Sequence, residues 1–283
     1  MNLHTIGVIG AGTMGNGIAQ VCALAGFDVT LIDISEAALH KAVVTVSKNL
    51  NRQIAKHTLT EQQKLAALGR IHTNTDYSSL QEVKLVIEAA TENLDLKLRL
   101  LQQIDKQVSA DCVIASNTSS LSITQLAASV SKPERFIGLH FFNPVPVMGL
   151  IEVIRGLQTS DATHALALEI ATVLGKTAIT AGNRPGFAVN RILVPMINEA
   201  ILVLQEGLAS AEDIDAGMRL GCNQPIGPLA LADLIGLDTV LAILEAFYDG
   251  FNDSKYRPAP LLKEMVAASY LGRKTGRGFH AYA

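Results

Sequence analysis

Short apolar runs alternate with longer amphipathic segments along the first two thirds of the chain. The runs are rich in Val and Ile and have the length of buried strands: TIGVIG, DVTLID, LVIEAA, CVIASN, RFIGLHFF and LIEVI. Helical patterns lie between them, at Met14–Leu24, Glu36–Lys56, Glu61–Leu68 and Leu94–Val108. Regular alternation of strands and helices predicts an α/β fold with a doubly wound, mostly parallel sheet.

The pattern changes after a last predicted edge strand, KTAITA, and the turn-rich segment GNRPG. A long helical pattern starts at Phe187, and Pro195 is expected to kink it. SAEDIDAGMRLG opens with a Ser-x-x-Asp cap, and two further helices are expected at Leu229–Phe247 and Leu261–Leu271. We therefore expect an α/β domain over residues 1–183 and an all-helical domain over residues 184–283.

A glycine-rich loop joins the first predicted strand to the first helix. Its glycines have the spacing G-x-G-x-x-G, and the next strand ends in Asp33. This context is typical of a Rossmann-type dinucleotide site, where the helix N-terminus faces the pyrophosphate. Asp33 can accept hydrogen bonds from ribose hydroxyls and would repel a 2′-phosphate, so NAD is favoured over NADP. The loop residues expected to contact NAD are Gly10, Gly12, Thr13, Met14 and Gly15.

The segment GLHFFNPVPVMGLIEVI places one ionisable side chain in each of two apolar runs, His140 and Glu152. If NPVPVMG connects two antiparallel strands, these residues face each other at a distance that lets a carboxylate reach an imidazole. A carboxylate fixes the tautomer of the ring and raises its basicity. The pair is then suited to take a proton from an alcohol during hydride transfer to NAD. A buried pair with no catalytic role is the alternative for such residues in isolation.

Polar residues also follow the strand CVIASN, in the cluster SNTSS. The carboxyl ends of strands line the ligand crevice of this fold, so Asn117 and Ser119 are candidates for contacts with nicotinamide and substrate. The alternative is that residues of the cluster cap the next helix, a role that suits Ser122 better than Ser119. Asn190 lies in the first turns of the helical domain, where its amide is expected to face a cleft between the domains.

Composition narrows the function classes. The chain has 283 residues, 17% of them charged, and a net charge of -3, which gives no global attraction to nucleic acid or anionic membranes. Its three cysteines are far apart and form no C-x-x-C pair, so we expect neither disulfides nor a metal site, and a reducing compartment. No run is apolar enough to span a bilayer, and no signal peptide is evident, so the cytoplasm is the expected location.

Seven segments carry a resemblance to a known family, and they occur in this order: GVIGAGTMGNGIA, IEAATENLDLK, SNTSSLSIT, GLHFFNPVPVMGLIEVI, RPGFAVNRI, PIGPLALADLIGLDT and GRKTGRGFHAY. Together they closely resemble the L-3-hydroxyacyl-CoA dehydrogenases, specifically the short stand-alone 3-hydroxybutyryl-CoA dehydrogenase type. The resemblance extends from Ile6 to Tyr282. HFFNPVPVM and NTSSL belong to that family rather than to Rossmann-type proteins in general, whereas His280 stands where the family more often has Tyr.

The resemblance implies NAD-dependent oxidation of a short-chain L-3-hydroxyacyl-CoA to 3-oxoacyl-CoA, and the reverse reduction of acetoacetyl-CoA. His140 would be the catalytic base and Glu152 its partner, while Ser119 and Asn190 would hydrogen-bond the substrate. Further positions match residues that contact NAD in the family: Asp33, Ala90, Glu92, Lys97, Asn117, Ser119, Asn143 and Lys274. The resemblance also implies a homodimer formed through the C-terminal helical domain.

A basic stripe gives separate support for a coenzyme A thioester. Lys41, Lys48, Arg52 and Lys56 lie on one face of a predicted helix, at spacings of seven, four and four. On spacing alone an ordinary solvated helix face is favoured. With the resemblance, we expect Lys48, Arg52 and Lys56 to bind coenzyme A phosphates. Two alternatives stay open: a two-domain dehydrogenase of a free hydroxy acid, and a non-catalytic NAD-binding relative of the kind represented by lens crystallins.

Overall fold

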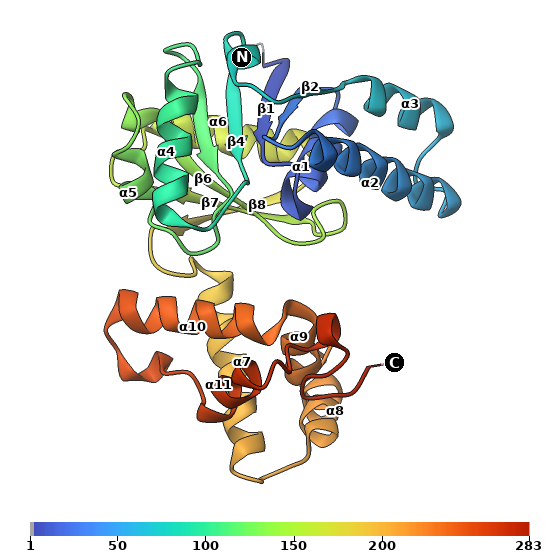
Figure 1. Cartoon of the computed structure of the whole chain (residues 1–283), viewed down its shortest axis with the longest axis vertical. Helices are drawn as coiled ribbons and strands as arrows, with labels where there is room; N and C mark the ends of the chain where they lie inside the picture. The colour runs from blue at the N-terminus through green and yellow to red at the C-terminus, as the bar shows by residue number, and fades with distance from the viewer. Residues whose placement is uncertain (1–2, 283) are drawn as a thin grey trace. The chain divides into compact units, whose positions relative to one another are not determined.

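The computed structural model describes residues 3–282, and these form two compact units that divide between Arg184 and Pro185 (Figure 1). The sequence placed this boundary between residues 183 and 184. Each unit has its own apolar core, one built around a sheet and one made of helices alone. An α/β fold with a helical C-terminal part is therefore confirmed.

The first unit contains an eight-stranded sheet within the described residues, in the order β3-β2-β1-β4-β5-β6-β7-β8. All neighbouring strands run parallel except β6 and β7, which form the one antiparallel pair of this sheet. The strands are β1 (Thr5–Ile9), β2 (Asp28–Ile32), β3 (Ile71–Asn74), β4 (Leu85–Glu88), β5 (Val113–Ser116), β6 (Phe136–Phe141), β7 (Leu150–Arg155) and β8 (Thr177–Gly182).

Helices flank this sheet (Figure 1). They are α1 (Thr13–Leu24), α2 (Glu36–Ala55), α3 (Glu61–Gly69), α4 (Leu94–Asp105), α5 (Ile123–Ala127) and α6 (Asp161–Val173), with short 3-10 turns at Ser78–Leu80 and Pro133–Arg135. Polar residues start several of them: the side chains of Ser35, Asn93 and Ser160 each accept a backbone hydrogen bond from the first helical turn. Such caps satisfy donors that have no partner inside the helix.

Two elements of the first unit were absent from the predicted set. β3 lies at the edge of the sheet and reads IHTN, with no fully buried residue, so it lacks the apolar run that marks the central strands. α6 covers the β6–β8 end of the sheet through Leu166, Ile170 and their neighbours. The predicted edge strand KTAITA is confirmed as β8.

The regular elements of the second unit are helices, apart from isolated β-bridges that join Arg277 to Gly272 and to Ala281. Its helices are α7 (Val189–Gln205), α8 (Ala211–Gly221), α9 (Pro228–Ile235), α10 (Leu237–Phe251) and α11 (Pro260–Ala267), with 3-10 turns at Ser254–Tyr256 and Arg273–Thr275. The expected Ser210 cap is present. The single helix predicted over Leu229–Phe247 was wrong, because Gly236 has a φ of 101° and divides the segment into α9 and α10. None of the helices described in either unit is long and apolar enough to cross a membrane.

Candidate functional site

The glycine loop lies between β1 and α1, at the carboxyl edge of the sheet. Gly10 has a φ of 99°, a backbone angle that residues with a side chain rarely adopt. A Cβ added to Gly15 would lie 1.7 Å from the Gly10 carbonyl oxygen, so α1 passes the loop at a distance that only glycine allows. A Cβ on Gly12, by contrast, would meet no protein atom within 4 Å. The three positions therefore provide a turn, an open face for a phosphate and a close helix crossing, as the motif predicts.

Asp33 holds the far side of this loop. Its carboxylate accepts hydrogen bonds from Ala11 N at 2.8 Å and from Ser35 N at 3.0 Å. These bonds join the end of β2 to the loop after β1 and fix the direction of the carboxylate. Thr13 is exposed and Met14 half-buried in the first turn of α1. The arrangement suits a nucleotide with free ribose hydroxyls, since each oxygen of Asp33 keeps a second lone pair.

A buried ionic network ties the end of β4 to the end of β5. Glu88 is 0% exposed and pairs with the ammonium of Lys97, which is 1% exposed. The Glu88 carboxylate also accepts from Ser116 Oγ at 2.9 Å and from Ala90 N at 2.8 Å. The Lys97 ammonium also donates to Ser116 Oγ at 3.3 Å. Lys97 thus ties the ends of β4 and β5 together, while Ala90 is exposed, and the expected contacts of both residues with NAD stay predictions.

A second carboxylate, Glu92, bridges the same two strand ends nearer the surface. It accepts from Thr118 Oγ1 at 2.7 Å, from Ser119 N at 2.8 Å and from Ser119 Oγ at 3.1 Å. The next helix, α5, is capped by Ser122, as expected, and Ser119 is not its N-cap. Glu92 therefore orients the Ser119 hydroxyl, a contact that the sequence did not reveal.

His140 and Glu152 face each other across the antiparallel pair β6 and β7, in the register that the turn predicted. His140 Nδ1 lies 2.7 Å from Glu152 Oε2. Glu152 is 0% exposed and His140 6%, and the Phe142 ring lies 4.5 Å from the imidazole. A carboxylate interacts more strongly with a protonated imidazole in such an interior than it would in water. The dyad geometry expected from the sequence is confirmed.

Asn117 links β5 to this pair, because its side-chain oxygen accepts from Phe141 N at 2.8 Å. Asn143 lies exposed in the turn between β6 and β7, next to a cis peptide bond with Pro144. A pocket of about 380 Å³ lies between this turn, the glycine loop and α2. Asn143 and Gly12 both line it, so the turn and the dinucleotide loop share one cavity of the first unit.

The basic residues expected to bind coenzyme A lie on the C-terminal half of α2 and just beyond it. Lys48, Arg52 and Lys56 are exposed, and none of the ion pairs found in residues 3–282 involves them. Arg52 makes only a long contact, 3.5 Å, with Asn49. This face of α2 is positively charged and open to an anion.

Two predicted site residues belong to the second unit. Asn190 is half-buried in the first turn of α7, and Lys274 pairs with Asp238 at the start of α10. His280 also has a structural partner there, because its Nε2 lies 2.8 Å from Asp215 Oδ2. The roles of Asn190 and Lys274 at the site of the first unit stay predictions.

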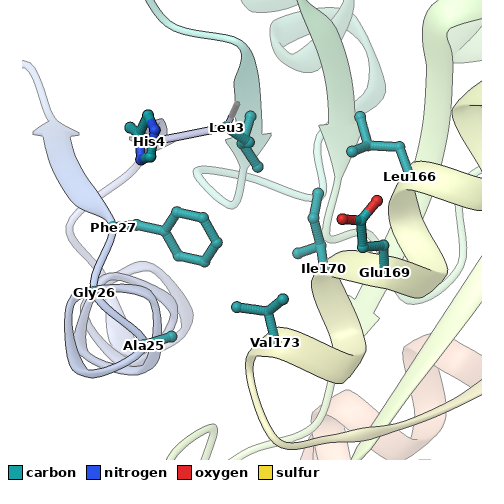
Figure 2. A pocket seen from close by; sticks show the side chains of 9 residues that line it. All are labelled: Leu3, His4, Ala25, Gly26, Phe27, Leu166, Glu169, Ile170 and Val173. Atoms are coloured by element: carbon teal, nitrogen blue, oxygen red, sulfur yellow. The ribbon is translucent and has the colours of Figure 1, made fainter. Parts of the chain in front are cut away.

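A separate cavity of about 210 Å³ lies at the opposite, amino edge of the sheet (Figure 2). Phe27 points into it from one side and Ile170 and Val173 from the other, with Glu169 at its margin. Leu3 and His4 precede β1 and close a further side. The glycine loop lies at the carboxyl edge of the sheet, and this cavity lies at the amino edge. The cavity is therefore distinct from the candidate site. In the described residues, no group of three or more His, Cys, Asp or Glu side chains is arranged to hold a metal ion.

Comparison with known proteins agrees with this geometry. The family model "3-hydroxyacyl-CoA dehydrogenase, NAD binding domain" matches residues 5–184, and the model of the C-terminal domain matches residues 186–282. The chain is 51% identical to a 3-hydroxybutyryl-CoA dehydrogenase of Bradyrhizobium diazoefficiens, over 99% of this chain and 96% of that protein. It is 43% identical to the mitochondrial hydroxyacyl-coenzyme A dehydrogenase of Rattus norvegicus, over 97% and 90%. The crystal structure of (S)-3-hydroxybutyryl-CoA dehydrogenase from Ralstonia eutropha superposes with a TM-score of 0.97, at 62% identity and full coverage of both chains.

Proposed function

The chain belongs to the 3-hydroxyacyl-CoA dehydrogenase family, and from this premise we propose that it interconverts a short-chain L-3-hydroxyacyl-CoA and its 3-oxoacyl-CoA with NAD. The observation that carries the proposal is the buried His140–Glu152 pair, which lies in the same unit as the glycine loop. The pair supplies a base for the alcohol, and the loop supplies a place for the dinucleotide.

His140 acts as the general base during oxidation and as the general acid during reduction. Glu152 occupies Nδ1, so the proton of the substrate hydroxyl is exchanged at Nε2. As the imidazolium forms, the Glu152 carboxylate stabilises its charge and holds the ring in place. When bound, NAD supplies the acceptor for the hydride that leaves C3 of the substrate.

The residues that hold NAD in this proposal divide into two groups. Gly10, Gly12, Thr13, Met14, Gly15 and Asp33 hold the adenosine and pyrophosphate. Ala90, Glu92, Lys97, Asn117, Ser119 and Asn143 hold the nicotinamide end, and Lys274 of the helical domain contacts NAD as well. The exposed backbone at Gly12 and the fixed carboxylate of Asp33 support the first group.

The substrate is held at both of its ends. Ser119 and Asn190 hydrogen-bond the reacting oxygen and the thioester, and Glu92 keeps the Ser119 hydroxyl directed. Lys48, Arg52 and Lys56 bind the phosphates of coenzyme A, a role that their exposure and lack of acidic partners support. We place the enzyme in the cytoplasm, as a homodimer formed through its helical domain.

Replacement of His140 by Ala tests the proposal. Turnover of acetoacetyl-CoA with NADH, followed by NADH absorbance, should fall about 100-fold to 10,000-fold, the usual contribution of a general acid–base group. NADH binding, followed by fluorescence, should persist because the substitution leaves the glycine loop and Asp33 untouched. His164→Ala is the matched control, since His164 lies in the same unit and its ring bonds the Thr180 hydroxyl at 2.8 Å. Normal turnover in His140→Ala would overturn the mechanism, and an inactive wild type that binds NADH would overturn the function.

A further inference from the structure

The turn between β6 and β7, residues 142–149, has an unusual set of supports. The ladder between the two strands stops at Phe141 and Ile151, so strand pairing does not position the turn itself. Within the turn, the N–H groups of Val147 and Met148 both donate to the Pro144 carbonyl. These bonds shape the turn, but they do not fix it against the rest of the unit.

Lys176 supplies one external support. Its ammonium donates to the Val145 carbonyl at 2.8 Å and to the Met148 carbonyl at 2.6 Å. The lysine precedes β8, and its neighbour Thr177 donates through its backbone N–H to the Gly149 carbonyl. Two consecutive residues of the β8 segment thus hold three carbonyls of the turn.

The ammonium of Lys176 has no acidic partner among the ion pairs of the described residues. Burial lowers the pKa of this lysine below its ordinary value. A half-buried charge that is matched only by carbonyl dipoles is costly compared with one in water. A lysine at this position therefore does not favour the stability of the fold. What Lys176 provides is its pair of hydrogen bonds to the turn.

The helix α1 supports the opposite side of the turn. Val145 is 2% exposed, and a Cβ added to Gly17 would lie 2.8 Å from Val145 Cβ and 3.5 Å from Pro146 Cδ. The first turn of the same helix carries the glycine loop. Lys176 and Gly17 therefore hold the turn from two sides, at a set distance from the dinucleotide site.

We propose that Lys176 is a positioning residue, which holds the β6–β7 turn so that Asn143 is aligned with the nicotinamide. The inference rests on the proposed function, since it assigns Lys176 to the same reaction. Lys176 touches neither cofactor nor substrate and acts through the turn. Loss of its two hydrogen bonds lets the turn shift away from α1, and small displacements of reacting groups are expensive in rate.

The test compares Lys176→Met with Lys176→Arg and with Lys84→Met. Met keeps the apolar stem and removes both hydrogen bonds, whereas Arg keeps donors. Lys84 is the control, because its pair with Asp111 is solvent-exposed and lies at the amino edge of the sheet. Turnover with acetoacetyl-CoA, NADH affinity, thermal unfolding and the primary isotope effect with NADH deuterated at the transferred position are measured for each.

Lys176→Met should lose about tenfold to 100-fold in kcat, the scale expected for a displacement near 1 Å. Its NADH affinity should stay within about threefold of the wild type, a change smaller than one ordinary hydrogen bond produces. Its isotope effect should rise as hydride transfer becomes rate-limiting, and Lys176→Arg should recover most of the rate. Unchanged kcat and isotope effect in Lys176→Met would overturn the inference alone. A lower melting temperature with normal turnover per folded molecule would do the same. An inactive wild type would overturn the proposed function and the inference together.

Discussion

The two halves of the candidate site are built in opposite ways. Around the glycine loop, the structure depends on absent side chains, at Gly10 and Gly15, and on one carboxylate, Asp33. Around the ends of β4 to β7, it depends on side chains that each bond to a neighbouring strand, such as Glu88 and Asn117. The glycine loop should therefore lose its structure when a side chain is added to it. The ends of β4 to β7 should lose theirs when one partner of a hydrogen bond or ion pair is removed.

Removal of Lys97 should have the largest effect on stability. Lys97→Met leaves the Glu88 carboxylate buried without its cation, which costs about 3–5 kcal/mol of unfolding free energy. Lys84→Met breaks an exposed pair with Asp111 and should cost about 0–1 kcal/mol. Chemical denaturation of both variants measures the contrast. Equal effects would mean that the buried network of Glu88 and Lys97 does not support the ends of β4 and β5.

Glu152→Gln tests the second half through its chemistry. The amide keeps the shape of the side chain but cannot balance an imidazolium charge, so kcat should fall about 100-fold. NADH affinity should be retained, because the glycine loop is untouched. Glu169→Gln, on α6 at the amino edge of the sheet, serves as the control in the same assay. If Glu152→Gln turned over normally, the carboxylate would be structural only.

The pair Gly15→Ala and Gly12→Ala tests the first half. The new methyl group at position 15 collides with the Gly10 carbonyl, which should cost about 1–3 kcal/mol of stability along with NAD binding. The methyl group at position 12 meets no protein atom, so the melting temperature should be kept while NADH affinity falls about tenfold. Thermal unfolding and a fluorescence titration separate the two outcomes. A stable Gly15→Ala that still binds NADH would show that the helix can move aside.

An effect confined to alkaline pH is expected from the core behind the first half. Burial raises the pKa of the Cys22 thiol to about 12, against an ordinary value of 9.0, with the Lys176 ammonium opposing the shift. The unfolded chain then releases this proton at a lower pH than the folded chain. The stability contributed by Cys22 is present below pH 9.0 and is lost as pH rises towards about 12.

Cys22→Ala should therefore flatten the alkaline loss of stability by about 1.4 kcal/mol per pH unit at most. Denaturant unfolding at several pH values, with exposed Cys222→Ala as the control, measures the slopes. Identical slopes in Cys22→Ala and the wild type would contradict the shift.

Local sequence patterns predicted the parts of the site that depend on local geometry. The turn NPVPVMG sets an antiparallel register, so the contact between His140 and Glu152 followed from counting residues. The glycine spacing likewise placed the loop and Asp33. Both cases involve neighbouring strands or a single strand–helix turn, where the connection itself limits the possible arrangements.

Contacts across parallel strands were not predictable in this way. Glu92 and Ser119 are 27 positions apart and meet through a helical crossover, so no short-range register links them. The ion pair of Lys97 and the carbonyl contacts of Lys176 depend on packing in the same manner. β3 was missed because an exposed edge strand needs few apolar residues, and the break at Gly236 because one glycine does not always end a helix.

Two strands of the sheet, β7 and β8, run opposite to the others, and this has a consequence for how such an enzyme can change. Glu152 stands in the middle of β7, with hydrogen-bonded strands on both sides, rather than on a loop at the rim. Insertions or deletions in the loops at the rim of the sheet would therefore leave the partner of His140 in place. The contact between His140 and Glu152 belongs to the strands, so changes confined to the loops would not alter it.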